Sequence, residues 1–553
     1  MTETRIDYSL GEYQSAVNGA LEKMRKDNII ARIRAKDYTV WKPAPDEITN
    51  RLGWLDAPAE TLKKMDDIHA AIDPLTQGSI SDVVLLGMGG SSLAAEVFNN
   101  IFGSKTGYPQ LHIVDTTDPV FISTVTKRLN LEKTIFLVSS KSGTTLEIIS
   151  LFKYFYNLVL RNSGNGAGRR FVFITDEGSP LIKIAKNISA HHTFLNNPDI
   201  GGRYSALSLP GIVPAAMIGV DVVKLLQRAI DAKLSDSGAS LGAALGTLAQ
   251  MGRDKLTFIM PSGWQSFGDW LEQLIAESTG KEGKGILPIL NEPLTDSAAY
   301  GRDRVFVVFQ NKEAVISSPI ESLVKAGHPV IKVEINDDYD LGAQMFIWEI
   351  ATAVAAHFLN INPFDQPDVE TTKKYTRVMI TEHKEKKNMI DAKPALTFAQ
   401  GDIFGKISGA TLGEVFKNFL KRAVVDNYIS LQIYLSPSGE IDTAVGHLRE
   451  AISKKLALPV TFGYGPRYLH STGQLHKGDS GKGLFIQFTQ DNAMDVDIPD
   501  DPGKAESSLT FGALKAAQAT GDWRALQDKG RRIIRIHFRE NPIAGFKNLA
   551  EIL

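Results

Sequence analysis

The sequence predicts an α/β protein built from two doubly wound parallel sheets in tandem, followed by an additional C-terminal α/β block. Two observations lead to this prediction. Short apolar runs alternate with helical stretches from about residue 82 onward, a pattern typical of parallel strands joined by helices. The chain has 553 residues, more than one hydrophobic core normally serves. We therefore expect several packed subdomains.

The composition is that of an ordinary folded protein, with 43% apolar and 22% charged residues. The formal net charge of -2 argues against nucleic acid or an anionic membrane as the main partner, so any anion must be held by a local site. The chain contains no cysteine, which removes disulfides, thiolate nucleophiles and cysteine-ligated metals and suits a reducing compartment. The N-terminus lacks the pattern of a signal peptide. We expect a cytoplasmic protein.

The chain divides into four segments. From about residue 10 to residue 75 the chain shows helical periodicity with many charges, which predicts an N-terminal helical segment over residues 1–75. Residues 76–235 contain four apolar runs, which end near 87, 115, 139 and 175, and predict the first sheet. Residues 236–385 repeat the alternation. A charged connector then marks the main boundary before the C-terminal block, residues 400–553, where we expect a strand at 428–434 and a helix at 441–456.

The best candidate in the sequence for a membrane span is residues 341–359. Gln344, Glu349 and His357 interrupt it, so a buried core helix explains it better than a membrane span.

A hydroxyl-rich loop, residues 139–145, gives the clearest sign of a ligand site. The apolar run 135–138 predicts a fully buried strand before it, and a helix follows it. The loop contains five hydroxyls around Lys141 and reaches no carboxylate before Glu147. Hydroxyl donors and free backbone N–H groups at a helix N-terminus favour a phosphate dianion. The alternative is that Thr144 and Thr145 only cap the helix, but five hydroxyls around a lysine favour a phosphate site.

A glycine turn at residues 87–92 ends the first strand and predicts close backbone approach to a ligand. By itself this signal is weak. It also fits a dinucleotide fingerprint, because Asp115 ends the next strand where a ribose-binding acid would lie. However, Ser92 occupies the place of the third glycine of that fingerprint, and the hydroxyl loop has no role in such a site. A nicotinamide enzyme is therefore a minority interpretation.

Three further segments carry candidate catalytic side chains. Arg203 follows two glycines, which would expose its guanidinium toward a pocket; taken alone, a salt-bridged surface loop explains it better. Glu277 lies at a helix C-terminus, where the dipole disfavours a carboxylate. A carboxylate in this position is more often a tolerated surface residue than a functional one. His470 and His476 share a hydroxyl-bearing loop and suit proton transfer, although solvated loop residues explain each one alone. Two histidines without nearby carboxylates make a poor metal pair, so we expect no metal.

These motifs together resemble those of the glucose-6-phosphate isomerase family. The segments that carry the resemblance are SSKSGTTLE, GMGGSS, GGRYS, AESTGK, NPFDQPDVE with Lys373, and LHSTGQ. They span residues 80 to 480, and six together are highly specific. The resemblance implies tandem sugar isomerase domains and a role in glycolysis and gluconeogenesis.

The resemblance also implies a role for each matching residue. Glu277 would shuttle a proton between the first two sugar carbons, Arg203 would stabilise the enediolate, and His470 with Lys373 would open the sugar ring. Gln366 would position the substrate. The phosphate would be held by Ser140, Ser142 and Thr145, with Lys141 beside them, and the sugar would be contacted by Gly89, Gly90 and Ser91. No cofactor is implied.

The order of the motifs departs from that of ordinary isomerases. There the histidine motif lies between the glutamate and the FDQ motifs, whereas His470 follows both. GPRYLHSTGQLHKG resembles the isomerase half of fused transaldolase and glucose-6-phosphate isomerase proteins. About 75 residues precede the first sheet, too few for a transaldolase barrel of about 250. The shifted order makes His470 the least secure assignment, with His476 as its rival.

We therefore predict an aldose-ketose isomerase that interconverts glucose 6-phosphate and fructose 6-phosphate through a cis-enediolate. A non-catalytic phosphosugar-binding regulator is the alternative from another class, but binding alone would not require Glu277 and His470. A dual phosphoglucose and phosphomannose isomerase is a second alternative, because Ser278 and Thr279 place hydroxyls beside the base. We expect a homodimer, although the third block would supply His470 within one chain, and a transaldolase is a candidate functional partner.

Overall fold

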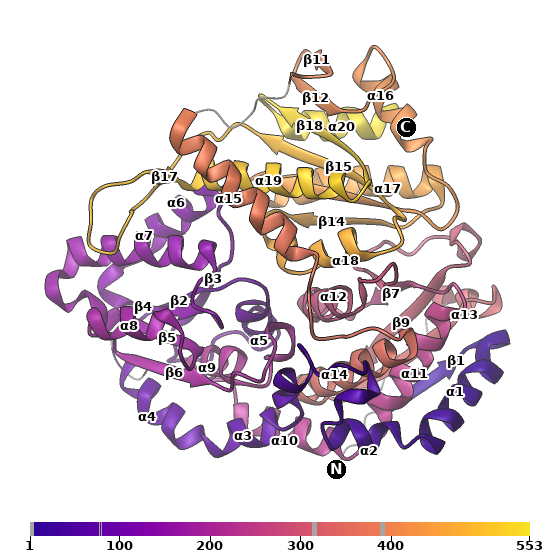
Figure 1. Ribbon diagram of the computed structural model, residues 1–553, viewed down its shortest axis with the longest axis horizontal. Coiled ribbons are helices and arrows are strands. Elements are labelled where there is room, and N and C mark those ends of the chain that lie inside the picture. Colours follow the sequence, from indigo (N-terminus) through magenta and orange to yellow (C-terminus); the bar gives the residue numbers. More distant parts are fainter. Residues whose placement is uncertain (1–4, 77, 79, 312–317, 387–392) are drawn as a thin grey trace.

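The computed structural model describes residues 5–76, 78, 80–311, 318–386 and 393–553. Three α/β blocks meet at the centre of the molecule (Figure 1). The first block, largely in purple, lies on the left of that view, the second lies at the lower right, and the third, in orange and yellow, lies on top. The predicted α/β class with parallel sheets is confirmed.

The first block contains a five-stranded parallel sheet in the order β3-β2-β4-β5-β6. Its strands are β2 (Asp82–Leu86), β3 (Gln110–Val114), β4 (Thr134–Ser139), β5 (Phe171–Asp176) and β6 (His192–Asn196). Alternate residues of β4 enter two different cores, with Ile135 and Leu137 on one face and Phe136 and Val138 on the other. Because both faces are buried, the strand reads as a continuous apolar run. The strand expected at 135–138 is confirmed.

Helices cover both faces of the first sheet (Figure 1). They are α5 (Leu93–Phe102), α6 (Pro119–Arg128), α7 (Leu146–Ser163), α8 (Pro180–Asn187) and α9 (Leu209–Met217).

The second block contains four parallel strands in the order β10-β9-β7-β8, with β1 added antiparallel beside β10. The strands are β1 (Ile6–Ser9), β7 (Lys255–Ile259), β8 (Leu287–Ile289), β9 (Arg304–Asn311) and β10 (Val330–Ile335). The helices are α10 (Val222–Lys233), α11 (Ser237–Gln250), α12 (Gln265–Thr279), α13 (Ser318–Lys325) and α14 (Asp340–Leu359).

Helices α11 and α14 pack closely because α11 has a glycine every four residues. A Cβ added at Gly242 would lie 2.4 Å from the Ala351 carbonyl oxygen, and one at Gly246 would lie 2.7 Å from the Phe358 Cβ. Almost all of α14 is buried, so the core helix expected at 341–359 is confirmed. In the part of the chain that the structure describes, no helix is long and apolar enough to cross a membrane.

The N-terminal segment contains helices from residue 14 onward, as the periodicity from about residue 10 to residue 75 predicts. Its helices are α1 (Gln14–Lys26), α2 (Ile29–Arg34), α3 (Ala57–Lys63) and α4 (Met65–Thr76), but β1 precedes them. This four-residue strand pairs with residues 330–333 of β10. Its own sequence carries too little pattern to reveal a partner more than 300 residues away.

The third block contains a mixed six-stranded sheet in the order β11-β12-β18-β15-β13-β14, in which β18, β15, β13 and β14 are parallel. The strands are β11 (Leu396–Phe398), β12 (Gly401–Gly405), β13 (Tyr428–Tyr434), β14 (Val460–Tyr464), β15 (Gly483–Gln490) and β18 (Arg532–Phe538). The helices are α16 (Leu412–Leu420), α17 (Gly439–Leu456), α18 (Gly473–Gly478), α19 (Phe511–Asp528) and α20 (Pro542–Ile552). The predicted strand at 428–434 and helix at 441–456 are confirmed.

Two elements tie the third block to the others. Helix α15 (Val369–Lys386) leads into it and packs along α19 (Figure 1). A short ribbon of β16 (Asp497–Ile498) and β17 (Leu509–Thr510) packs near α7 of the first block. The expected charged connector begins inside α15, because the helix continues to Lys386. Residues 387–392 of the connector lie outside the described residues.

Candidate active site

A cavity of about 580 Å³ lies where the three blocks meet, at the carboxyl end of the first sheet. Ligands of open α/β sheets bind at this end of the strands. The predicted site residues that line the cavity are Gly89, Gly90, Ser91, Lys141, Ser142, Thr145, Arg203, Glu277, Gln366, Lys373 and His470. Ser140 lies directly behind them, buried in the loop. The fold thus brings together residues that are widely spaced in sequence.

The hydroxyl loop folds around its own side chains at the end of β4. The Ser140 hydroxyl accepts a hydrogen bond from the Gly143 N–H at 3.1 Å, and the Ser142 hydroxyl accepts one from the Thr144 N–H at 3.2 Å. Gly143 has φ +66°, and a Cβ there would lie 2.1 Å from the Ser179 hydroxyl, so the turn requires glycine. Thr145 precedes α7, but its side chain makes no capping hydrogen bond. Helix capping therefore does not account for the Thr145 hydroxyl, which faces the cavity.

Lys141 is anchored at the side of this loop. Its ammonium pairs with the Asp176 carboxylate and donates to the Pro198 carbonyl at 2.6 Å. Burial raises the pKa of Asp176 above its ordinary value even though Lys141 opposes the shift. The lysine is consequently held at the cavity wall.

The glycine turn lets two other segments approach the cavity closely. A Cβ at Gly90 would lie 2.0 Å from the Gly202 carbonyl oxygen, and one at Gly89 would lie 2.7 Å from the Gln273 amide nitrogen and 3.0 Å from the His470 Cβ. These glycines are therefore required by packing. Asp115, the acid that a dinucleotide site would need, is buried outside the cavity lining, 3.4 Å from the Arg467 guanidinium.

The Arg203 guanidinium is fixed beside the Glu277 carboxylate. Its Nη1 lies 3.3 Å from Glu277 Oε1 and donates to Gln366 Oε1 at 2.9 Å. Its Nε donates to the Ser278 hydroxyl at 2.8 Å, and its Nη2 donates to the Pro363 and Asp365 carbonyls. Arg203 is only 4% exposed. The surface-loop interpretation of this arginine is wrong, because it is a preorganised cation at the cavity wall.

Glu277 lies at the end of α12, and polar neighbours offset the unfavourable helix dipole. The Gln273 amide donates to Glu277 Oε2 at 3.2 Å, and Arg203 approaches the other oxygen. The Glu277 side chain is 14% exposed, so the surface explanation for this carboxylate is also wrong. The carboxylate faces the cavity, and each of its two oxygens contacts a neighbouring side chain.

His470 is paired with a buried carboxylate. Its Nε2 lies 3.0 Å from Glu147 Oε1, which also accepts from the Gln518 amide at 2.7 Å. Burial alone would lower the pKa of His470, but the Glu147 carboxylate raises it above its ordinary value. Burial alone would raise the pKa of Glu147, but His470 lowers it. The pair therefore favours an imidazolium beside a carboxylate.

His476 lies in a different environment. It is 2% exposed, packs against the rings of Tyr428 and Phe485, and does not line the cavity. Burial lowers its pKa well below the ordinary value. Of the two rival histidines, only His470 reaches the cavity.

Lys373 enters the cavity from α15. Its ammonium pairs with the Glu370 carboxylate at 2.6 Å, and its side chain is 46% exposed. It is the most solvated of the four predicted catalytic residues.

Several lining or supporting residues were missed at the sequence level. Gln273 precedes Glu277 by one helical turn, so position along the helix would have indicated it. Glu147 contacts His470 from another block, and its place in the sequence gives no sign of that contact. Arg51 and Asp176 also line the cavity, and the sequence offers no signal for Arg51. In the described ranges, no group of three or more His, Cys, Asp or Glu side chains is arranged to hold a metal ion.

Solved structures share this fold. The hypothetical protein TT0462 from Thermus thermophilus superposes with a TM-score of 0.58 over 68% of this chain and 99% of that chain, at 24% identity. A glucose-6-phosphate isomerase from Chlamydia trachomatis gives a TM-score of 0.58 over 69% of this chain and 89% of that chain, at 17% identity. These two likenesses show a shared α/β fold.

Sequence comparisons add a matching family model and named relatives. Residues 57–241 match the family model of phosphoglucose isomerase. The chain is 27% identical over 387 residues to a glucose-6-phosphate isomerase from Enterococcus faecalis, covering 58% of this chain and 85% of that protein. It is 29% identical over 388 residues to a probable glucose-6-phosphate isomerase from Haloarcula marismortui, covering 61% and 86%. The chain is therefore similar in sequence to phosphoglucose isomerases, with the family model confined to residues 57–241.

Proposed function

We propose that the protein interconverts glucose 6-phosphate and fructose 6-phosphate by moving one proton between C1 and C2 through a cis-enediolate. The observation that carries the proposal is the pairing of Glu277 with Arg203 in a cavity that the hydroxyl loop also lines. A base, a fixed cation and an anion-binding loop in one cavity are what this reaction needs.

The hydroxyl loop supports binding of the sugar phosphate. Ser142 and Thr145 present hydroxyls to the cavity, and Lys141 adds a positive charge. Helix α7 is 18 residues long and begins directly after Thr145, so its N-terminal N–H groups and dipole favour a dianion. Gly89, Gly90 and Ser91 would contact the sugar on the neighbouring wall.

Glu277 is the proposed base for the carbon-bound proton. It would take the proton from C2 of the open-chain aldose and return it to C1, and the reverse for the ketose. General base catalysis of this kind contributes typically ~10²–10⁴-fold. Arg203 would stabilise the negative oxygens of the enediolate, and a preorganised donor of this type contributes on the order of 3–4 kcal/mol. Gln366, which accepts from Arg203, would help to orient the substrate.

His470 is the proposed acid for ring opening. Glu147 raises the pKa of His470 above its ordinary value, which favours the protonated ring, and that proton would pass to the ring oxygen as the ring opens. Glu147 would hold the imidazolium, and Lys373 would assist from the solvated side. His470 comes from the same chain as Glu277, so the proposed chemistry needs no second subunit. A homodimer and a transaldolase partner remain predictions.

The alternative that mannose 6-phosphate is also accepted finds no support in the geometry. The hydroxyl of Ser278 accepts from Arg203, and that of Thr279 donates to the Ile275 carbonyl at 2.7 Å. Both residues are buried, and neither lines the cavity. The two hydroxyls therefore stabilise the end of α12 and its contact with Arg203.

The test is isomerisation of fructose 6-phosphate by the purified protein, read by a coupled glucose-6-phosphate dehydrogenase assay with a metal chelator present. We expect activity in the wild type and a loss of about a hundredfold or more in Glu277→Gln. Glu282→Gln is a matched control, because this carboxylate is 47% exposed and pairs with Lys42 outside the cavity. A wild type that binds the sugar phosphate without turnover would instead support the regulator.

A further inference from the structure

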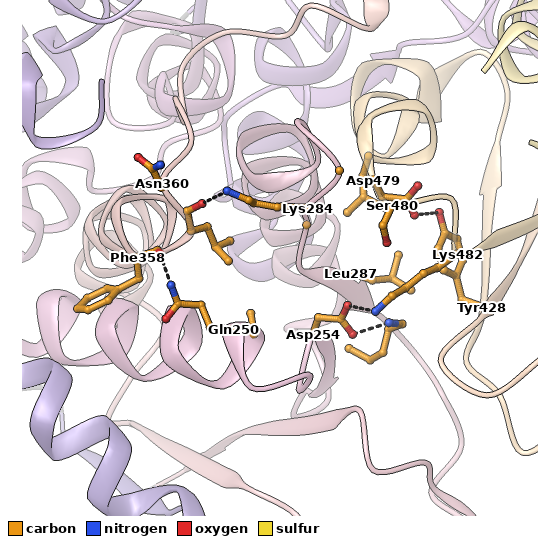
Figure 2. A pocket seen from close by; sticks show the side chains of 16 residues that line it. Gln250, Asp254, Lys284, Leu287, Phe358, Asn360, Tyr428, Asp479, Ser480 and Lys482 are labelled. Atoms are coloured by element: carbon orange, nitrogen blue, oxygen red, sulfur yellow. Dashed lines mark hydrogen bonds and ion pairs between the residues drawn. The ribbon is translucent and has the colours of Figure 1, made fainter. Parts of the chain in front are cut away.

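A second cavity, of about 340 Å³, lies between the second and third blocks. Figure 2 shows Gln250 from the end of α11, Phe358 and Asn360 from the end of α14, and Tyr428 and Lys482 from the third block around it. None of its lining residues lines the active-site cavity. It is therefore a separate site, formed only where the two blocks meet.

The acidic groups in this cavity are already neutralised. Asp479 pairs with Arg531 at 3.0 Å and accepts from the Tyr428 hydroxyl at 3.2 Å. Asp254 is shared between the ammonium groups of Lys255 and Lys482. Neither carboxylate is left to attract a cation.

The lysines, by contrast, have donors to spare. An ammonium carries three N–H donors. In the described part of the chain, the Lys284 ammonium contacts only one acceptor, the Leu359 carbonyl at 2.7 Å (Figure 2). Among the same residues, the Ser480 hydroxyl and the Asn360 amide make no side-chain hydrogen bond. The cavity therefore offers positive charge and unused polar groups together.

The remaining walls are apolar. Leu287 and Leu475 are buried hydrophobic side chains, and the Tyr428 ring lies beside them. Burial raises the pKa of Tyr428 well above its ordinary value, so its hydroxyl stays a donor. Small-molecule pockets of about 300–1,000 Å³ with apolar walls and a few polar groups are typical ligand sites.

We propose that this cavity binds a small organic anion, with its phosphate or carboxylate held by Lys284 and Lys482 and its body against Leu287, Leu475 and Tyr428.

The position of the cavity gives such a ligand access to both catalytic elements. The loop residues 283–285 follow α12, which carries Glu277, and Leu475 belongs to α18, which follows His470. The two elements interlock: the Gly283 N–H donates to the Gly478 carbonyl at 2.9 Å, and the Gln474 amide donates to the Gly280 carbonyl at 3.0 Å. A bound anion would contact both sides of this interlock. An effect on turnover follows only if the proposed isomerase function holds.

The test is calorimetric titration of the full-length protein with phenyl phosphate, whose ring matches the apolar walls. We expect saturable binding that weakens about tenfold or more in Lys284→Ala and in Lys482→Ala, because each change removes a charged donor. Lys325→Ala is a matched control, since this lysine is 79% exposed and lies outside the cavity. Lys284→Gln serves as a second variant that keeps a polar side chain of similar length.

Three results would overturn the proposal: no saturable binding, equal binding by wild type and both lysine variants, or binding that only Ser142→Ala weakens, which would place phenyl phosphate in the active site. Titration with benzoate distinguishes the two anion sources. Binding of both compounds indicates a site that accepts carboxylates, and binding of phenyl phosphate alone indicates a phosphate site. The titration is repeated with Glu277→Gln. Binding in the second cavity should be unchanged in this variant, because it does not depend on the proposed isomerase chemistry.

Discussion

His470 and His476 occupy neighbouring regions of the third block, the 3-10 turn Arg467–His470 and the helix α18, yet they have opposite properties. His470 faces the active-site cavity, and Glu147 raises its pKa. His476 is buried among aromatic rings, and burial lowers its pKa. The comparison shows that a carboxylate from a different block, rather than the local sequence, decides which histidine can hold a proton.

The strongest test of this comparison is the effect of removing each ring on turnover. We expect His470→Gln to lower kcat for the cyclic substrate about a hundredfold, because a general acid is lost. His476→Phe keeps an aromatic ring of similar size, and we expect a change of less than about threefold. Steady-state kinetics on both variants measures the difference. Equal losses in the two variants would show that the loop contributes only structure.

The second test disturbs the contact between α18 and α12. A Cβ at Gly280 would lie 2.3 Å from the Leu475 Cα, so Gly280→Ala must shift one backbone against the other. We expect a loss of about 1–3 kcal/mol in the free energy of unfolding and a fall in kcat of roughly tenfold, because His470 and Glu277 move apart. Denaturant unfolding and kinetics measure both effects.

Gly446→Ala is the control for this change. It also adds one methyl group, but nothing lies within 4 Å of its position in α17, so stability should stay the same or rise slightly. Full activity and stability in Gly280→Ala would contradict the interlock of the two helices.

The third test removes the charge that distinguishes His470. In Glu147→Gln the imidazolium loses its partner while burial continues to disfavour it, so the pKa of His470 should fall. We expect kcat near pH 8 to drop about fivefold and its pH profile to move to lower pH. A purely structural defect would lower kcat at every pH without moving the profile, and that result would rule out the pairing.

The smallest expected effect concerns stability and pH. Folding lowers the pKa of His476, so this ring contributes stability that is present above its unfolded pKa and is lost as the pH falls. Folding raises the pKa of His470, so its contribution has the opposite sign: it is present at acid pH and is lost as the pH rises through the folded pKa. When the pH falls from about 7.5 to about 5.5, the wild type should lose about 1 kcal/mol in the free energy of unfolding because of His476. The His476→Phe variant should not show this loss. Denaturant titrations at both pH values measure it, and an unchanged acid loss would contradict the buried neutral ring.

The sequence predicted those features that depend on local pattern. The apolar run at 135–138 is fully buried, as its composition required, and the hydroxyl loop follows it at the carboxyl end of the sheet. The strand at 428–434 was also predicted, and all seven of its residues are buried although Ser430 and Gln432 are polar.

Features that depend on distant partners were not predictable in this way. Strand β1 exists through its pairing with β10, and Glu147 acquires its role from a histidine in another block. The choice between His470 and His476 likewise needed the fold, because both residues have similar neighbours in the chain. Arg203 and Glu277 each looked like surface residues when considered alone, but the fold buries both and brings them into contact across 74 positions.

The hydrogen bond between His470 and Glu147 spans 323 positions of the chain, and that between Gln518 and Glu147 spans 371. Contacts of such separation form late, since each requires closure of a very long loop and docking of blocks that have already folded. During refolding, helix content would therefore return before this pair is assembled. If the proposed isomerase function holds, turnover would count only those molecules in which all three blocks have docked, and it would therefore report completed assembly.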